Sequence, residues 1–214
     1  LEISWRDYVL LVNPYPIFPQ HFTIPHKTHK IQEILPHFSD MLDLAMLLPD
    51  FVVFYNGPKS GASAPDHFHF QAGTKNFLPL IGQRSTVEKK EIRSSVFLWK
   101  NYLRSVVEVV NSCKNEVIDI FREIYAKLQT DNAEPMMNVV AFYENECWHV
   151  LVLPRKTFRP WQYSAEDESE KLLISLGTAE MCGVLIAPVK EHFERISEKD
   201  IEDIFSQVSL EISW

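Results

Sequence analysis

Two histidines and a glutamine alternate with phenylalanines in the pentapeptide HFHFQ at residues 67–71. Alternate side chains of a β-strand lie on the same face, so a strand over residues 67–73 would bring His67, His69 and Gln71 together. Polar groups on one face of an otherwise apolar strand are costly to bury unless they are solvated, paired or used in chemistry. We therefore expect this face of the strand to carry a functional site.

A neutral histidine on such a face could act as a nucleophile toward phosphorus near pH 7. Its second ring nitrogen must then be held as a hydrogen-bond donor, so that the attacking nitrogen keeps its lone pair. The charge that builds on the phosphoryl oxygens needs fixed donors, which Gln71, Ser63 and backbone N–H groups could supply. A covalent nucleotidyl-histidine would divide one phosphoryl transfer into two steps.

A loop of small residues, GPKSGASAP, occupies residues 57–65 shortly before the motif. Half of the chain's six glycines, Gly57, Gly61 and Gly73, lie around the two motif histidines. Glycine and serine allow backbone N–H groups to approach phosphate oxygens closely, and Lys59 adds a positive charge. We expect this loop to contact the phosphate groups of a ligand.

The composition is that of a globular protein rather than a fibrous, disordered or membrane-spanning chain. The 214 residues are 46% hydrophobic and 23% charged, which is ordinary for one large domain or two closely packed ones. No run of about 18 uncharged apolar residues is present. The net charge of −8 disfavours a general nucleic-acid binder, although a nucleotide pocket needs only a few local donors. We expect neither nucleic acid nor a membrane among the partners.

The three cysteines are widely spaced and odd in number, which excludes a disulfide framework and a Cys-x-x-Cys zinc site. We expect reduced thiols and a cytoplasmic location. No cofactor is expected to be required, and neither zinc nor magnesium has support in the pattern. A zinc ion on the histidine pair is nevertheless an alternative, which would need a third ligand from His21, His26 or His29. Taken singly, His21, His26 and His37 are expected at the surface or in loops.

The rest of the chain predicts the strands and helices that would position this site. Ser39 is the expected N-cap of a helix that ends at Leu48, and Ser197 with Asp200 caps the last helix. Apolar residues at helical spacing mark another helix over residues 117–128. Strands are predicted at residues 7–13, 21–25, 51–56, 67–73, 96–99, 103–110, 138–143 and 148–153. The predicted fold class is α+β, an antiparallel sheet with flanking helices.

The stretch NGPKSGASAPDHFHFQ, residues 56–71, closely resembles the histidine-triad superfamily. The nearest similarity is to the branch of diadenosine tetraphosphate phosphorylases, galactose-1-phosphate uridylyltransferases and GDP-galactose phosphorylases, in which glutamine replaces the third histidine, as here. Residues 10–25 resemble the entry hairpin of these proteins, and residues 138–156 resemble the second of their two tandem histidine-triad-like units. The resemblance implies two such halves, residues 1–110 with the motif and residues 111–214 without the motif histidines.

The resemblance also implies roles for individual residues. His69 matches the nucleophilic histidine, Gln71 the residue that hydrogen-bonds the transferred phosphoryl group, and His67 the supporting first histidine of the motif. The substrate-binding positions that it implies are Asn56, Gly57, Lys59, Ser60, Gly61 and Ser63 in the loop, His29 in the entry segment, and Arg155 in the second half.

These matches imply a nucleotidyltransferase or nucleotide phosphorylase that forms a covalent nucleotidyl-histidine. The expected substrate is a (di)nucleoside polyphosphate or a nucleotide sugar, and the expected acceptor is phosphate or a sugar phosphate. Two alternatives remain, a hydrolase of the same fold that transfers the group to water and a catalytically silent nucleotide-binding module of a larger protein. The intact His69 and Gln71 favour a working enzyme. The sequence leaves the nucleobase, the acceptor and the oligomeric state open.

Overall fold

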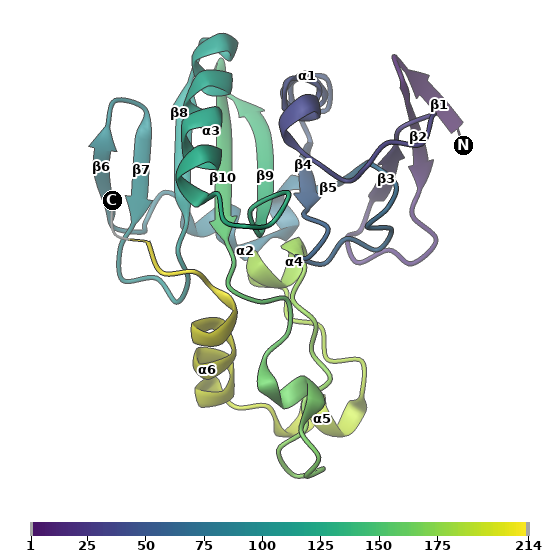
Figure 1. The fold of residues 1–214 in the computed structure, drawn as a ribbon, viewed down its shortest axis with the longest axis vertical. Helices are drawn as coiled ribbons and strands as arrows, with labels where there is room; N and C mark the ends of the chain where they lie inside the picture. Colours follow the sequence, from purple (N-terminus) through teal and green to yellow (C-terminus); the bar gives the residue numbers. More distant parts are fainter. Residues whose placement is uncertain (1, 213–214) are drawn as a thin grey trace.

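The computed structural model describes residues 2–212, which form an antiparallel sheet with flanking helices (Figure 1). This arrangement confirms the predicted α+β fold class. The described strands are β1 (Glu2–Trp5), β2 (Tyr8–Val12), β3 (His21–Pro25), β4 (Phe51–Asn56), β5 (His69–Thr74), β6 (Lys89–Arg93), β7 (Val96–Trp99), β8 (Val107–Asn111), β9 (Met137–Glu144) and β10 (Cys147–Pro154). The described helices are α1 (Phe38–Leu47), α2 (Pro79–Gln83), α3 (Lys114–Leu128), α4 (Thr178–Met181), α5 (Lys190–Arg195) and α6 (Glu198–Val208), with 3₁₀ turns at Leu35–His37, Lys75–Phe77 and Trp161–Ser164.

The order of the strands is symmetric about the middle of the sheet. From one edge to the other it runs β1-β2-β3-β5-β4-β9-β10-β8-β7-β6, and each described pairing is antiparallel. Each of the first five strands thus has a counterpart five numbers later, at the same distance from the central pair β4 and β9. We propose from this order that the two halves meet in the segment 75–88, between β5 and β6. The boundary expected at residue 110 would instead cut through β8.

Two hydrophobic clusters lie on the two faces of the sheet, because neighbouring residues of each strand point to opposite sides. Val53 and Tyr55 of β4 belong to the first cluster, together with the buried residues of α1 and α3. Val52 and Phe54 of the same strand belong to the second cluster, together with apolar residues of the segment 172–208. The segment that follows β10 therefore closes the sheet face opposite to α1 and α3.

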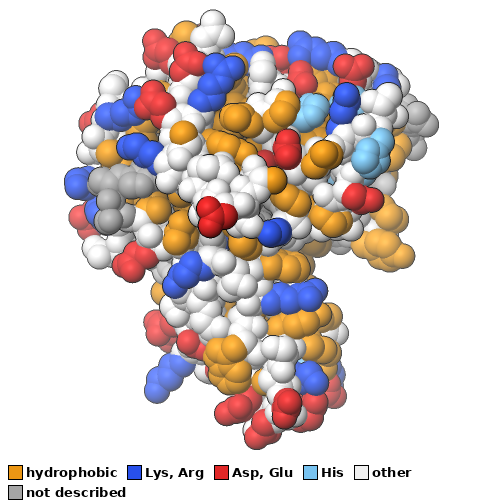
Figure 2. Space-filling model, viewed as in Figure 1, with side chains coloured by type: hydrophobic (Ala, Val, Ile, Leu, Met, Phe, Trp, Pro, Cys, Tyr) orange, Lys and Arg blue, Asp and Glu red, His pale blue; other side chains and the backbone are white. Residues whose placement is uncertain are grey.

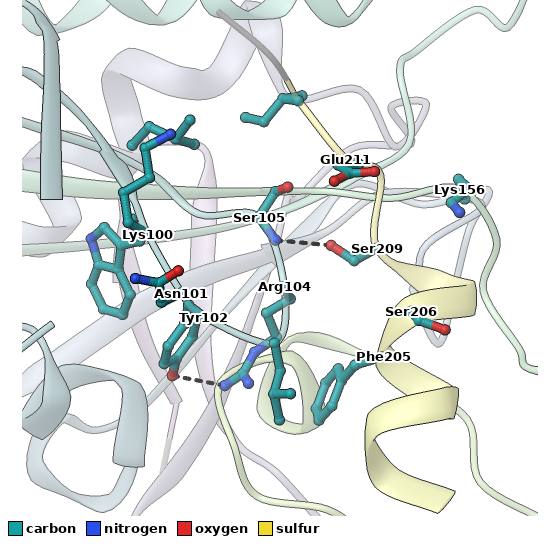
Figure 3. Close-up of a pocket in the computed structure, with 14 residues that line it drawn as sticks. Lys100, Asn101, Tyr102, Arg104, Ser105, Lys156, Phe205, Ser206, Ser209 and Glu211 are labelled. Atoms are coloured by element: carbon teal, nitrogen blue, oxygen red, sulfur yellow. Dashed lines mark hydrogen bonds between the residues drawn. The ribbon is translucent and has the colours of Figure 1, made fainter. Parts of the chain in front are cut away.

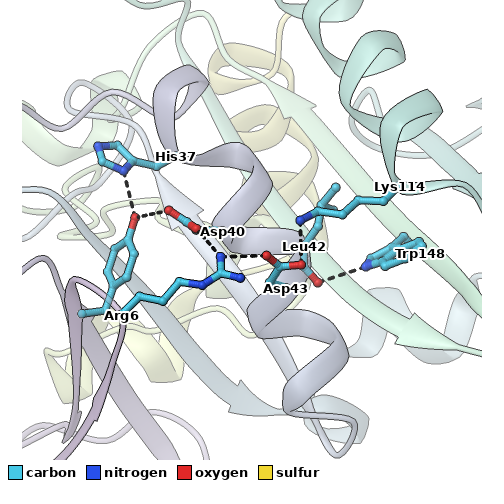
Figure 4. Close-up of polar contacts among 8 residues, drawn as sticks. Arg6, His37, Asp40, Leu42, Asp43, Lys114 and Trp148 are labelled. Atoms are coloured by element: carbon cyan, nitrogen blue, oxygen red, sulfur yellow. Dashed lines mark hydrogen bonds and ion pairs between the residues drawn. The ribbon is translucent and has the colours of Figure 1, made fainter.

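Polar contacts attach the N-terminal hairpin to the helices of the first face (Figure 4). Arg6, between β1 and β2, donates from Nη1 to Asp40 Oδ1 and Asp43 Oδ2, both at 2.8 Å. Tyr8 donates its hydroxyl to Asp40 Oδ2 at 3.0 Å, and Lys114 of α3 donates to Asp43 Oδ1 at 2.6 Å. These contacts orient α1 between the hairpin and α3, although partly exposed ion pairs add little stability singly.

Several predicted elements have the expected bounds. Strands β3 and β4 coincide with the predicted segments 21–25 and 51–56, and α3 contains the predicted helical stretch 117–128. The last helix, α6, begins with the predicted capping box, in which Ser197 Oγ accepts from the Asp200 backbone N–H and the Asp200 carboxylate accepts from Ser197. Local signals of periodicity and capping suffice for these elements.

Other elements begin at residues that differ from the predicted ones, and α1, β8 and β5 are examples. The 3₁₀ turn at Leu35–His37 runs directly into α1, so the helix begins at Phe38 and Ser39 lies in its first turn instead of capping it. Strand β8 begins at Val107 rather than at residue 103, because the preceding residues belong to the loop after β7. Strand β5 begins at His69, two residues later than predicted.

The segment after β10 forms a smaller lobe below the sheet, where α5 and α6 lie (Figures 1 and 2). Trp161 and Phe193 of this lobe are exposed. On the face seen in Figure 2, acidic and basic side chains are interspersed over the upper part of the molecule, and acidic side chains gather at the tip of the lower lobe. Among residues 2–212, no helix combines the length and the apolar character that crossing a bilayer requires.

The contact between α1 and α3 generates a first testable prediction. The ring of Phe121 is fully buried and stacks on Phe38, with centroids 3.7 Å apart. We expect Phe121→Ala to lower the free energy of unfolding by about 3–5 kcal/mol, since it leaves a cavity between the helices. Urea unfolding would measure this loss, with Arg122→Ala on the exposed side of α3 as the control. A loss below about 1 kcal/mol would contradict the packing described here.

Candidate functional site

The pairing of β5 with its neighbours places His69 and Gln71 on the face of the second hydrophobic cluster. Gln71 lies opposite Thr23 of β3 and Phe54 of β4 in the register of the sheet. Phe54 belongs to the second cluster, whereas Phe70 belongs to the first. His69 is two residues from Gln71 in the same strand, so both side chains face the segment that follows β10.

The hydrogen bonds of His69 fix which ring nitrogen carries the proton. Its Nδ1 lies 2.9 Å from the carbonyl oxygen of His67. A carbonyl oxygen can only accept, so Nδ1 is the donor and Nε2 keeps its lone pair. The Nε2 atom is buried and has no hydrogen-bond partner among the described residues. Burial is the main cause that lowers the pKa of His69, which favours the neutral ring near pH 7.

His67 contributes its backbone carbonyl oxygen to the site, as the acceptor for His69 Nδ1, whereas its ring bonds elsewhere. It precedes β5, and its Nε2 lies 2.9 Å from the carbonyl oxygen of His26. The face predicted for three polar side chains therefore holds only two of them, His69 and Gln71. His29, a predicted substrate contact, is exposed, and its ring lies 5.7 Å from that of His67. Within residues 2–212, no three His, Cys, Asp or Glu side chains are grouped so that they could hold a metal ion.

Two asparagines join β4 to β9 beside His69. Asn138 donates from Nδ2 to Asn56 Oδ1 and to the carbonyl oxygen of Ser60, both at 2.8 Å. Asn56 Oδ1 also accepts from the backbone N–H and the hydroxyl of Thr178, at 2.8 and 2.7 Å. This buried network fixes the start of the small-residue loop against the sheet and against α4.

The small-residue loop is wedged between the sheet and the N-terminus of α4. The backbone N–H of Gly57 donates to the Met137 carbonyl oxygen at 3.2 Å. Gly61 has φ of +99°, and a Cβ there would lie 2.8 Å from the Cα of Gly177. Ser60 is fully buried, and its Oγ, like His69 Nε2, lacks a partner in the described part of the chain. A ligand oxygen or nitrogen at this place would satisfy groups that the protein leaves unpaired.

A cleft of about 470 Å³ opens beside this loop. Four predicted site residues line it, namely Asn56, Gly61, Ser63 and Gln71. The loop between β2 and β3 forms one wall, and residues 177–180 at α4 form another. His69 lies two residues from Gln71 but is 4% exposed and does not line the open part of the cleft.

Two predicted substrate contacts have other partners. Lys59 donates to Asn132 Oδ1 at 2.6 Å on the surface, away from the cleft. Arg155 is 3% exposed and donates to Asn138 Oδ1 at 2.6 Å. Its remaining acceptors are the backbone carbonyl oxygens of residues 157, 158, 176 and 208. Burial lowers the pKa of Arg155 to about 10. Arg155 therefore holds the segment after β10 against the sheet instead of facing a substrate.

Sequence reasoning did not select most of the residues that line the cleft, among them His21, Thr178 and Glu180. His21 was expected at the surface, but it is 4% exposed, and its Nε2 lies 2.8 Å from Gln71 Oε1. The alternation of His21 and Thr23 in a predicted strand was the signal that could have placed both on one face. Thr178 and Glu180 gave no such signal, because the residues that they approach lie far away in the sequence.

A second cleft, of about 340 Å³, lies between the loop after β7 and the end of α6 (Figure 3). Arg104 lies there between the rings of Tyr102 and Phe205, each 4.5 Å from its guanidinium carbon. It donates from Nε to the Met181 carbonyl oxygen and from Nη2 to the Tyr102 hydroxyl. None of the predicted site residues lines this cleft.

Residues 85–213 match the family described as GDPGP1-like, C-terminal domain, and residues 2–74 match a domain of unknown function, DUF4922. A comparison with curated protein sequences gave no match.

The fold is similar to that of solved structures. Yeast Ap4A phosphorylase Apa2 matches with a TM-score of 0.65 and 18% identity, over 95% of this chain and 72% of that one. The same enzyme in complex with Ap4A gives a TM-score of 0.63. A DUF4931 family protein from Bacillus cereus matches with a TM-score of 0.52 and 15% identity, over 77% of this chain and 89% of that one. Identities this low establish a common fold and no more.

The contact between Gly61 and Gly177 predicts a strict requirement for glycine. We expect Gly61→Ala to destabilise the protein by about 1–3 kcal/mol, because φ is positive and the new Cβ would collide with backbone. Gly82→Ala in α2, where a Cβ would meet nothing within 4 Å, is the matched control and should be neutral or slightly stabilising. Thermal unfolding of both variants measures the difference. Equal melting temperatures would refute the close approach.

The buried carboxyl of Glu180 predicts a pH-dependent contribution to stability. Burial raises its pKa to about 7, so the folded state binds a proton that the unfolded state releases near pH 4.5. The contribution of the protonated carboxyl to the free energy of unfolding is complete below pH 4.5 and is lost as the pH rises through 7. Glu180→Gln keeps an acceptor for the Gly177 N–H but cannot ionise. Its free energy of unfolding relative to that of the parent should therefore be about 2–3 kcal/mol higher at pH 8 than at pH 5.

Urea unfolding at pH 5 and at pH 8 measures this difference. Glu166→Gln, at an exposed acidic residue, is the control. A Glu180→Gln variant with the same free energy of unfolding as the parent at both pH values would contradict the burial of this carboxyl.

Proposed function

The chain belongs to the family described as GDPGP1-like, C-terminal domain, and its fold is similar to that of yeast Ap4A phosphorylase, so we infer that it belongs to the histidine-triad-like branch of Ap4A phosphorylases, uridylyltransferases and GDP-galactose phosphorylases. From this premise we propose that it is a nucleotidyltransferase or nucleotide phosphorylase that works through a covalent nucleotidyl-histidine at His69. The donor is a (di)nucleoside polyphosphate or a nucleotide sugar, and the acceptor is phosphate or a sugar phosphate.

One observation carries this proposal, the state of the His69 ring. Its Nδ1 proton is held by the His67 carbonyl oxygen at 2.9 Å, and its Nε2 is buried without a partner. A buried nitrogen with a free lone pair is costly unless something uses it. Since burial also lowers the pKa of this ring and so favours its neutral form, Nε2 is suited to attack a phosphorus atom.

In the first step, His69 Nε2 attacks the phosphorus of the nucleotidyl group. The new N–P bond forms while the P–O bond to the leaving group breaks, and the bonding electrons leave with that oxygen. The leaving group is the remaining nucleoside polyphosphate of a dinucleoside polyphosphate, the remaining phosphate chain of a nucleoside polyphosphate, or the sugar phosphate of a nucleotide sugar. The ring becomes cationic, and the His67 carbonyl oxygen stabilises the charge through its bond to Nδ1–H. Gln71, Ser63 and backbone N–H groups of the loop supply donors for the phosphoryl oxygens.

In the second step, an oxygen of the acceptor attacks the same phosphorus. The N–P bond breaks, its electrons return to Nε2, and the neutral ring is restored without moving the Nδ1 proton. Side chains and backbone alone supply the groups in both steps, so we propose that no metal or other cofactor is required. The burial of Nε2 favours transfer to a bound acceptor over transfer to bulk water.

The cleft wall formed by the loop between β2 and β3 suits the apolar part of a nucleotide. Tyr15, which is 86% exposed, and Ile17 line the cleft, and Phe54 and Phe158 line its interior. Aromatic faces beside donors of the small-residue loop would bind a base and its phosphates together. The yeast phosphorylase of similar fold has been solved with AMP and with Ap4A, which supports a nucleotide ligand.

The proposal is tested by the fate of labelled nucleotide. We expect the protein to consume members of a panel of nucleoside diphosphates, dinucleoside polyphosphates and nucleotide sugars only when phosphate or a sugar phosphate is present. His69→Ala should abolish turnover, and Gln71→Ala should lower kcat by about 10²–10³-fold, as expected when one transition-state donor is lost. The exposed variant Arg122→Ala serves as the control.

Trapping with nucleotide labelled at the transferred phosphorus should yield a protein adduct on His69 that is labile in acid and stable in alkali. Label on another residue, or full activity of His69→Ala, would refute the mechanism. Equal product yields without any acceptor would identify a hydrolase instead, and nucleotide binding without turnover would identify a silent binding module.

A further inference from the structure

The two ring nitrogens of His21 contact groups of different kinds. The backbone N–H of Ile17 points at Nδ1 with a separation of 3.1 Å, and Nε2 lies 2.8 Å from Gln71 Oε1. A backbone N–H can only donate, so Nδ1 must be an acceptor and the ring proton must be on Nε2. The contact at Nε2 is therefore a donated bond, which requires the oxygen of the Gln71 amide and excludes its NH₂ group.

This tautomer is supported by the surroundings of the ring. His21 is 4% exposed and packs against the rings of Phe18 and Phe54, at 5.0 and 5.9 Å between centroids. Burial is the main cause that lowers its pKa, which favours the neutral form. Phe18 in turn occupies the space over Gly73, where a Cβ would lie 2.4 Å from its ring. The glycine beside the motif thus admits the ring against which His21 rests.

We propose that His21 is the positioning residue that sets the orientation of the Gln71 amide. With Oε1 held by His21, the NH₂ group is directed to the other side of the amide. That group has no partner among the described residues, and Gln71 lines the cleft. The inference rests on the proposed function, in which this NH₂ group donates to the transferred phosphoryl group. A flipped amide would present an oxygen there and would repel the charge that develops.

The same ring connects the amide to the wall of the cleft. Ile17 lines the cleft and belongs to the loop between β2 and β3, and its N–H is held by His21 Nδ1. One imidazole therefore aligns the loop that would contact the base with the amide that would contact the phosphate. In the described part of the chain, no other side chain hydrogen-bonds both the Ile17 N–H and the Gln71 amide.

Two substitutions separate the two bonds of His21. His21→Asn keeps an acceptor near the Nδ1 position for the Ile17 N–H but loses the donor to Gln71. His21→Gln keeps an amide donor near the Nε2 position. We expect His21→Asn to lower kcat by about 10–100-fold with KM changed less than threefold, because the donor is misaligned rather than removed. We expect His21→Gln to recover most of kcat.

A measurement that needs no activity keeps this inference separate from the proposed function. In the unmodified protein, nitrogen NMR of the imidazoles should report a proton on Nε2 of His21 and, in contrast, on Nδ1 of His69. Thermal unfolding verifies that both variants are folded. A proton on Nδ1 of His21, or a folded His21→Asn variant with unchanged kcat, would overturn the positioning role. Full activity of His69→Ala would overturn the proposed function alone and would leave the tautomer result standing.

Discussion

The side chains of Asn56 and Asn138 meet where the two central strands pair, and the arrangement of the site depends on that meeting. Each polar group buried there would be costly without a partner. Asn56 Oδ1 accepts three hydrogen bonds, and Asn138 both donates to the small-residue loop and accepts from Arg155. The network thereby joins the sheet, the loop and the segment after β10. The backbone that would surround a phosphate group is fixed by residues from three separate parts of the chain.

Much of the local structure could be predicted from the sequence, because its signals are local. The alternation in residues 67–73 and the small residues before it are sufficient to select His69, Gln71 and the loop. The strand at residues 51–56 is an apolar run that ends at Asn56 and Gly57, and the alternating strand at residues 21–25 ends at Pro25. The alternation does not define where β5 starts, because the His67 N–H bonds the Ala64 carbonyl oxygen and the Phe68 N–H bonds that of Lys30.

What could not be predicted depends on contacts between distant residues. Arg155 resembles a substrate contact in sequence, and only its distant acceptors reveal a buried structural role. His21 and Glu180 enter the cleft because strand pairing and the course of the segment after β10 bring them there. The order of the ten strands has no local signature, since it is set by which strands pair.

The strand order also has a consequence for the sequence of events in folding. On each side of the β4–β9 pairing, hairpin partners such as β1 and β2 or β6 and β7 are close in the sequence, so their contacts form with little loop-closure entropy. The central pairing of Val53 with Ala141 closes a much longer loop, and such contacts are slow to form. The hairpins on each side are thus expected to form before the β4–β9 pairing, the seam of the sheet, closes. Because this seam contains Asn56 and Asn138, a chain in which the seam has not closed would carry His69 beside a loop whose position is not yet fixed.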